Sequence, residues 1–120
     1  MKTRVIVLAA GRGTRMNAEV PKVLIPFEGK PMIMHLLDAV KSSGVDPRTV
    51  IVTGFQADLV EKTLGSAFDY VRQEEQLGTG HAVACAELRL RGAADQIIVL
   101  YGDHPFVKPS TIVKLRELHE

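Results

Sequence analysis

The sequence has a single cysteine, Cys85, among its 120 residues, no tryptophan, and only 5% aromatic residues. One cysteine cannot form a disulfide within the chain or build a cysteine-based zinc site. No apolar run approaches the roughly 20 residues that a membrane-spanning helix needs, and the longest runs are residues 5–10 and 97–101. The run near the N-terminus is also too short, and too soon followed by glycine and arginine, for a secretory signal. The composition therefore predicts a cytoplasmic protein that does not enter membranes.

Excess charge of either sign is also missing. Fifteen Lys and Arg residues against 14 Asp and Glu residues give a net charge of +1. Such a balance creates no long-range field that would attract nucleic acid or an anionic membrane surface, so any anion-binding site must be local. With 46% apolar residues, the chain can form a core, either as one small domain or as part of a larger one.

The pattern of apolar residues predicts repeated β-α units. Strands are expected at residues 4–10, 49–53 and 96–101, with a shorter one at 69–72, and helices at residues 31–43, 56–64, 79–90 and 109–120. The first strand is apolar at nearly every position, which is typical of a central parallel strand covered on both faces. We therefore predict an α/β fold with a mostly parallel sheet and helices on both faces.

A glycine-rich segment follows the first predicted strand. Gly11 and Gly13 would let backbone amides approach a ligand without obstruction by side chains, which favours a phosphate site. Arg15 and Lys22 lie in the same stretch, and the first 22 residues carry five basic side chains against one acidic side chain. This excess of positive charge predicts a polyphosphate as the ligand.

Two known glycine-loop patterns do not fit this segment. The P-loop needs Gly-Lys-Ser/Thr, but Gly29 and Lys30 are followed by Pro31. The dinucleotide-binding fingerprint fails at its third glycine, where Met16 stands, which argues against a dehydrogenase. An ordinary strand-to-helix turn with solvated arginines is the alternative interpretation.

A second motif runs from residue 73 to residue 82 and leads into a predicted Ala-rich helix. The carboxamides of Gln73 and Gln76, beside the exposed backbone of Gly78, can read the hydrogen-bonding edge of a nucleobase, and Thr79 can cap the helix. A solvated loop with a helix cap is the alternative. His81 is expected to be structural, because a helix N-terminus disfavours a charged imidazolium.

A third motif, Tyr101-Gly102-Asp103-His104, follows the last predicted strand. A carboxylate at the carboxyl end of a parallel strand is well placed for a ligand or a metal ion, and Mg²⁺ often takes one carboxylate together with water and phosphate oxygens. A plain turn is the alternative. His104 is predicted to lie partly buried behind the site, because adjacent residues of a strand point to opposite faces.

Together, residues 8–16, 21–24, 76–82 and 101–103 resemble the sugar-phosphate nucleotidyltransferases. They resemble most closely the N-terminal uridyltransferase domains of bifunctional N-acetylglucosamine-1-phosphate uridyltransferases/glucosamine-1-phosphate acetyltransferases. The likeness spans the whole chain, and Ala10 stands where relatives acting on glucose 1-phosphate usually have another glycine. The resemblance implies a Rossmann-like nucleotide-diphospho-sugar transferase fold, of which residues 1–120 would form the N-terminal, nucleotide-binding part.

The resemblance also implies a reaction, in which UTP and N-acetylglucosamine 1-phosphate give UDP-N-acetylglucosamine and pyrophosphate. The implied catalytic residues are Arg15 and Lys22, with Asp103 as the ligand of Mg²⁺. The implied binding residues are Leu8, Ala9, Ala10, Gly11, Gly13 and Lys22 for the nucleotide and its phosphates, Gln73, Gln76, Gly78 and Thr79 for uracil, and Tyr101, Gly102 and Asp103 for the nucleotide-sugar. In the family, a second metal ligand and most of the sugar pocket come from later residues. Nucleotide binding without turnover, or another sugar phosphate as substrate, therefore remain alternatives.

Overall fold

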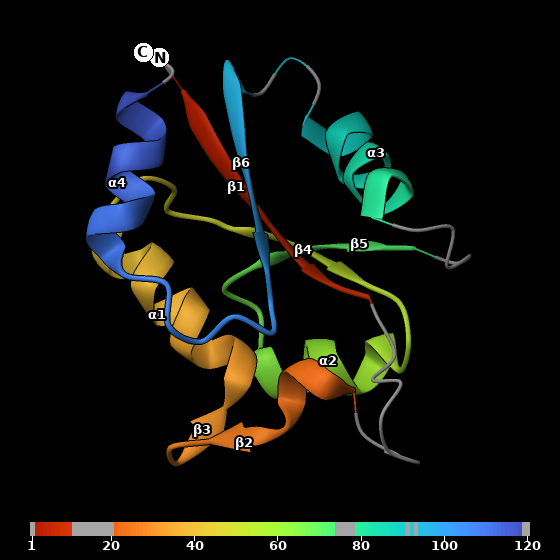
Figure 1. The fold of residues 1–120 in the computed structure, drawn as a ribbon. Helices are drawn as coiled ribbons and strands as arrows, with labels where there is room; N and C mark the ends of the chain where they lie inside the picture. Colours follow the sequence, from red (N-terminus) through yellow and green to blue (C-terminus); the bar gives the residue numbers. More distant parts are fainter. Residues whose placement is uncertain (1, 11–20, 74–78, 91, 93, 119–120) are drawn as a thin grey trace.

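A four-stranded parallel sheet organises the chain. The computed structural model describes residues 2–10, 21–73, 79–90, 92 and 94–118. The strands of the sheet are β1 (Thr3–Ala9), β4 (Val50–Thr53), β5 (Asp69–Arg72) and β6 (Gln96–Tyr101), in the order β5-β4-β1-β6, and all neighbours are parallel. Strand β1 is an inner strand, as its apolar sequence predicts, and Figure 1 shows it between β4 and β6.

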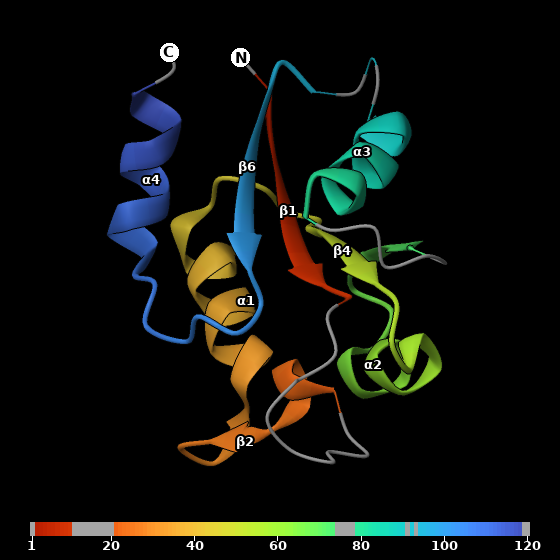
Figure 2. The same cartoon turned by 45° about the vertical axis from the view of Figure 1, so that its right-hand side comes forward.

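The helices cover the sheet on both faces (Figures 1 and 2). One face packs against α1 (Met32–Ser43), α2 (Ala57–Leu64) and α4 (Pro109–Glu117), and the other packs against α3 (Thr79–Leu90). Alternate residues of β1 enter the two cores, because successive side chains of a strand point to opposite faces. Val5 and Val7 join the first core, whereas Ile6 joins the second. This arrangement confirms the predicted α/β fold class.

The boundaries of the elements lie close to the predictions. Gly44 ends α1 with a φ of 70°, a left-handed conformation that glycine adopts easily. Pro31 is the residue before α1 and not its first helical residue. Gln56 likewise precedes α2. The final helix ends at Glu117, short of the predicted residue 120, and residues 119–120 lie outside the described part.

Three short elements between β1 and α1 are absent from the sequence predictions. They are the 3-10 helix η1 (Lys22–Leu24) and the antiparallel strands β2 (Pro26–Phe27) and β3 (Lys30–Pro31). The turn between the strands consists of Glu28 and Gly29, which both have positive φ, the pattern of a tight two-residue hairpin. Val23 and Leu24 are buried against the first core, so η1 is fixed where the chain passes the sheet.

A buried carboxylate ties the amino end of the sheet together. The Asp46 side chain is 1% exposed. It accepts hydrogen bonds from the backbone N–H of Val5 at 2.7 Å, the backbone N–H of Arg48 at 2.9 Å and Nε of Arg4 at 3.0 Å. Each of these bonds compensates for part of the cost of burying the charge. The cluster lies at the opposite end of the strands from the predicted site.

No helix in the described ranges is long and apolar enough to cross a membrane.

Candidate functional site

The described candidate residues gather at the carboxyl edge of the sheet. Because all four strands are parallel, the segments that follow them lie along one edge. Leu8 and Ala9 end β1 and Ala10 follows it, Gln73 follows β5, and residues 101–103 end and follow β6. Five predicted site residues lie outside the described part of the chain: Gly11, Gly13, Arg15, Gln76 and Gly78. Thr79 is described only as the first residue of α3.

The ends of β1 and β6 are joined closely. Leu8 pairs with Tyr101 in the parallel register, and the backbone N–H of Gly102 donates to the carbonyl oxygen of Leu8 at 2.9 Å. A Cβ atom on Gly102 would lie 3.0 Å from that oxygen and 3.0 Å from Cγ1 of Val23. The glycine is therefore required by close packing, and this packing fixes where the chain carries Asp103.

A cation and a carboxylate meet at this junction. Nζ of Lys22 lies 3.2 Å from Oδ2 of Asp103, and the two side chains are 53% and 31% exposed. Lys22 starts η1, where its neighbours Val23 and Leu24 are buried, so its own side chain extends outward over the sheet edge. The two residues come from distant parts of the sequence, and both are among the predicted site residues.

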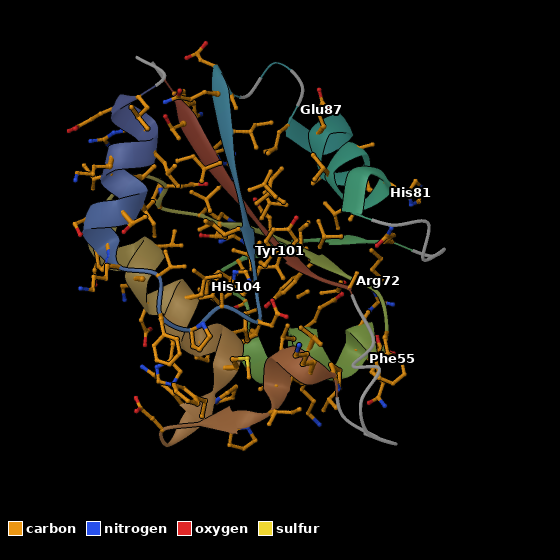
Figure 3. The ribbon with its side chains drawn as sticks, in the orientation of Figure 1. Phe55, Arg72, His81, Glu87, Tyr101 and His104 are labelled. Carbon is orange, nitrogen blue, oxygen red and sulfur yellow. The ribbon has the colours of Figure 1, made fainter. Side chains whose placement is uncertain are left out.

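The prediction for His104 is wrong. Its side chain is 62% exposed, and its Nε2 lies 3.7 Å from Oδ1 of Asp103. The alternation of strand faces does not apply here, because β6 ends at Tyr101 and the chain then turns, with the backbone N–H of His104 bonded to the carbonyl oxygen of Tyr101 at 3.1 Å. The rings of Tyr101 and His104 lie 5.5 Å apart, centroid to centroid (Figure 3). His104 therefore lies beside Asp103 on the surface.

Gln73 lies at the other end of the same edge. Its backbone N–H donates to the carbonyl oxygen of Thr53 at 2.7 Å, which prolongs the pairing of β4 with β5. Its side chain is buried, and its Nε2 lies 2.9 Å from Nδ1 of His81 in the first turn of α3. Gln73 and Asp103 follow opposite edge strands of the sheet, separated by three strand spacings, or about 14 Å. An extended ligand such as a nucleotide could span this separation.

Arg72, which the sequence interpretation did not single out, holds the end of β5 to α2. Its Nε lies 3.0 Å from Glu61, and one terminal nitrogen lies 2.5 Å from Asp58. Hydrogen bonds to Glu61 and Asp58, together with the charges of these carboxylates, raise the pKa of Arg72 above its ordinary value. Glu61 also accepts from the hydroxyl of Thr53 at 3.1 Å. Arg72 therefore links the end of β5 to α2 through ion pairs with two carboxylates, next to Gln73.

Asp103 suits a divalent cation that takes few protein ligands. Among the described residues, no group of three or more His, Cys, Asp or Glu side chains is arranged to hold a metal ion. A single, partly exposed carboxylate beside a lysine fits Mg²⁺, which usually binds one or two carboxylates and completes its shell with water and phosphate oxygens. The donor set does not fit a structural zinc site, which needs four closely placed ligands.

A separate hollow of about 580 Å³ opens between α1, the residues before β4, and the segment after α2. Its lining includes Leu37, Lys41, Thr49 and Phe68 and none of the candidate residues. Because Thr49 precedes β4, this hollow lies toward the amino ends of the strands. It is therefore distinct from the candidate nucleotide site.

His81 and Lys22 illustrate what the sequence could and could not reveal about the site. Lys22 was found from its place in a basic stretch. The contact of His81 with Gln73 was missed, because it joins a strand end to a helix start and has no characteristic spacing. The one sequence feature that indicates this contact is the imidazole of His81 close to the motif that contains Gln73 and Gln76.

A parallel sheet with helices on both faces and candidate binding residues along its carboxyl edge is typical of Rossmann-like nucleotide-binding domains. The chain belongs to the family of MobA-like NTP transferase domains, whose model matches residues 5–120.

Two curated relatives are both named bifunctional protein GlmU. The protein from Shouchella clausii is 46% identical over 115 residues, covering 96% of this chain and 25% of the relative. The protein from Roseobacter denitrificans is 48% identical over 115 residues, covering 93% of this chain and 25% of the relative. The chain thus spans about a quarter of the length of these relatives and matches their N-terminal region.

Solved structures share the fold. A nucleotidyl transferase from Methanothermobacter thermautotrophicus is 31% identical with a TM-score of 0.78, over 97% of this chain and 57% of that one. Rv0371c from Mycobacterium tuberculosis, solved in complex with manganese, is 26% identical with a TM-score of 0.81, over 99% of this chain and 60% of that one. These matches confirm the Rossmann-like nucleotidyltransferase fold, of which the chain covers the N-terminal part.

Proposed function

We propose that this chain forms the nucleotide-binding part of a uridyltransferase that converts UTP and N-acetylglucosamine 1-phosphate to UDP-N-acetylglucosamine and pyrophosphate. The observation that carries the proposal is the meeting of Lys22 and Asp103, 3.2 Å apart, at the carboxyl edge of the sheet. The resemblance of the sequence motifs to the N-acetylglucosamine-1-phosphate uridyltransferases supports the choice of substrates, and the GlmU relatives are 46% and 48% identical to the chain.

The reaction needs no general base. A phosphate oxygen of the sugar phosphate attacks the α-phosphorus of UTP and forms a new P–O bond. The bond from that phosphorus to the oxygen bridging to the β-phosphate breaks, and pyrophosphate leaves with the electron pair. Because the attacking oxygen is already anionic, the protein has mainly to position both substrates and stabilise negative charge.

We assign the basic residues to the phosphates of the substrates. Lys22, half exposed and directed over the edge, would stabilise charge on the departing pyrophosphate, and Arg15 is proposed to act with it. Asp103 would hold the divalent cation, which we propose is Mg²⁺ and which neutralises phosphate charge when bound. Lys22 must leave Asp103 to reach a phosphate, and an ion pair this exposed is weak enough to separate.

The remaining candidates are assigned to substrate binding. The backbone of residues 8–11, with Gly13, is proposed to contact the nucleotide, and residues 101–103 the nucleotide-sugar. Uracil is assigned to the other end of the edge, where Gln73 is proposed to act with Gln76, Gly78 and Thr79. The estimated 14 Å between Gln73 and Asp103 leaves room for a nucleotide with its base at one end and its phosphates at the other.

The test is release of pyrophosphate from UTP in the presence of Mg²⁺ and N-acetylglucosamine 1-phosphate. We expect release that depends on the sugar phosphate, and its loss in Lys22→Ala and in Asp103→Asn. Lys62→Ala is the matched control, because Lys62 is also an exposed lysine but lies on α2. Wild-type rates in both site variants would contradict the assignment.

Kinetic measurements with alternative substrates test the specificity. In the first set, CTP, GTP or dTTP replaces UTP. In the second set, glucose 1-phosphate replaces N-acetylglucosamine 1-phosphate. UTP and N-acetylglucosamine 1-phosphate should give the highest kcat/KM. Binding of UTP without turnover would restrict the proposal to nucleotide binding, and the absence of nucleotide binding would refute it.

A further inference from the structure

Two donor groups on neighbouring residues lie side by side just beyond the end of β6. Nε2 of His104 lies 3.7 Å from Oδ1 of Asp103, whereas Nζ of Lys22 lies 3.2 Å from Oδ2 of the same carboxylate. The two carboxylate oxygens therefore have different neighbours. Oδ2 is next to an ammonium group, which cannot bind a cation, and Oδ1 is next to a ring nitrogen, which can donate a lone pair to one.

A turn brings the two groups together. Along an extended strand, neighbouring side chains point to opposite faces. Strand β6 ends at Tyr101, however, and the backbone N–H of His104 donates to the carbonyl oxygen of Tyr101 at 3.1 Å, the bond that closes a β-turn. The ring of Tyr101 lies 5.5 Å from the imidazole of His104, centroid to centroid, and restricts the positions open to it (Figure 3). The turn and the ring contact thus hold His104 next to Asp103.

The separation suits one shared cation. Transition-metal ions bind imidazole nitrogen and carboxylate oxygen at about 2.0–2.2 Å, so two such ligands of one ion lie about 3.0 Å apart at an octahedral angle and about 3.4 Å apart at a tetrahedral angle. The observed distance of 3.7 Å is only slightly longer. The side chains of His104 and Asp103 are 62% and 31% exposed, so they can close this difference without disturbing the core.

We propose that His104 is a second protein ligand of the cation at Asp103, and that it favours transition-metal ions such as Co²⁺ over Mg²⁺. This inference rests on the part of the proposed function that assigns the cation to Asp103. Imidazole suits transition-metal ions, whereas Mg²⁺ binds oxygen ligands. The cation takes the lone pair of Nε2 and leaves the ring proton on Nδ1, so binding itself selects the tautomer. The remaining positions of the ion stay open to water and substrate oxygens.

A metal ligand and a counter-ion predict opposite effects of removing the imidazole. If His104 merely paired with Asp103 as a cation, its loss would free the carboxylate and strengthen the binding of every divalent cation. If Nε2 is a ligand, its loss weakens the binding of Co²⁺ and leaves the binding of Mg²⁺ nearly unchanged. The sign of the change in Co²⁺ affinity therefore separates the two roles.

Two substitutions of His104 and one of another histidine form the test. His104→Phe keeps a ring against Tyr101 and removes both nitrogens, and His104→Asn replaces the ring by a short polar side chain. His35→Gln is the matched control, because it also removes an imidazole, but from α1, where Nε2 contacts the carbonyl oxygen of Phe27. Asp103→Asn removes the carboxylate. Circular dichroism and urea unfolding establish that each variant is folded.

Titration with Co²⁺, followed by visible absorption, and competition with Mg²⁺ give the dissociation constants of both cations in the absence of nucleotide. Loss of a group that only orients a metal ligand costs about 10-fold to 100-fold in affinity. We therefore expect both His104 variants to bind Co²⁺ at least about tenfold more weakly, and Mg²⁺ within about twofold of wild type. His35→Gln should bind both cations as wild type does.

A spectroscopic measurement tests the ligand directly. An imidazole bound to paramagnetic Co²⁺ gives a strongly shifted N–H proton signal that exchanges with water. The NMR spectrum of the Co²⁺-loaded wild type should contain this signal, and the spectra of both His104 variants should lack it. The same signal in His104→Phe would contradict the inference.

The outcomes distinguish this inference from the proposed function. Unchanged or tighter Co²⁺ binding in both His104 variants would overturn the inference alone, and so would equal losses of Co²⁺ and Mg²⁺ affinity. A loss of Co²⁺ affinity in His35→Gln as large as in His104→Phe would overturn it as well. Equal binding of both cations by wild type and Asp103→Asn would overturn the inference together with the proposed metal site. A wild-type chain that releases no pyrophosphate but shows the expected Co²⁺ preference would contradict the proposed reaction and support the inference.

Discussion

Lys22 and Asp103 meet across the ends of β1 and β6, with 3.2 Å between the ammonium nitrogen and one carboxylate oxygen. Lys22 reaches this position because η1 packs Val23 and Leu24 beneath it. Asp103 reaches it because Gly102 lets β6 lie against Leu8 and Val23. The pair therefore depends on packing on both sides, although its own side chains are only partly buried.

Replacement of Lys22 should reduce activity strongly and change stability little. We expect Lys22→Ala to lower the rate of pyrophosphate release by about 100-fold to 1,000-fold, the usual effect of removing one charge-stabilising donor. The loss of an exposed ion pair should change the free energy of unfolding by at most about 1 kcal/mol. Steady-state kinetics and urea unfolding measure the two effects. Lys22→Arg, which keeps the charge, should retain more activity than Lys22→Ala, and equal rates would argue against a charge-based role.

Metal binding should respond oppositely to changes at the two residues. In the absence of nucleotide, Lys22 competes with a divalent cation for Asp103, so Lys22→Ala should bind Mn²⁺ about twofold to fivefold more tightly. Asp103→Asn should abolish this binding. Electron paramagnetic resonance of free Mn²⁺ gives both affinities. Equal Mn²⁺ binding by wild type and Asp103→Asn would place the metal elsewhere.

The buried Asp46 should be among the most sensitive positions for stability. Asp46→Ala leaves the N–H groups of Val5 and Arg48 and the Arg4 guanidinium without their shared acceptor. We expect a loss of about 3–5 kcal/mol in the free energy of unfolding, as for other broken buried pairs. Asp38→Ala is the control, because Asp38 pairs with Lys30 on the surface, and it should cost at most about 1 kcal/mol. Similar losses in the two variants would contradict this interpretation.

Tyr70 should make stability decline at high pH. Burial, with a further contribution from the negative charge of Glu61 and opposed by Arg48, raises the pKa of Tyr70 above its ordinary 10.0. The folded state therefore holds the phenol proton more tightly than the unfolded state. This contribution is complete below pH 10.0 and is lost as the pH rises through the raised value. Urea unfolding of Tyr70→Phe should show a shallower decline above pH 10.0 than wild type, and parallel profiles would exclude the effect.

The fold and the location of the site were predictable because both depend on patterns that recur along the chain. The apolar first strand predicted a central position, and the parallel arrangement then required residues 8–10, Gln73 and Asp103 to share one edge. The small elements η1, β2 and β3 were not predicted, because two or three residues are too few to show a periodicity. Their formation depends on burial of Val23 and Leu24 under long-range packing.

The errors and omissions at the site arise from local geometry. The prediction for His104 relied on strand alternation, which does not hold beyond Tyr101, where β6 ends and the chain turns. The contact between Gln73 and His81 depends on how α3 docks beside β5, and a polar ring beside the motif is too weak a sequence signal to predict it. The sequence thus predicts the residue types at the site better than it predicts their contacts.

Gly102 links the packing of the sheet to the position of Asp103, and Gly102→Ala tests that link. The added Cβ would lie 3.0 Å from the carbonyl oxygen of Leu8, a backbone atom that cannot move aside without disturbing β1. We expect a loss of about 1–3 kcal/mol in the free energy of unfolding, from overpacking. Mn²⁺ binding should weaken as well, because the turn that carries Asp103 is displaced. The control is Gly80→Ala on α3, where a Cβ meets nothing within 4 Å and the stability should be unchanged or slightly higher. Wild-type stability and metal affinity in Gly102→Ala would show that the junction tolerates a side chain, and that Asp103 is held by other contacts.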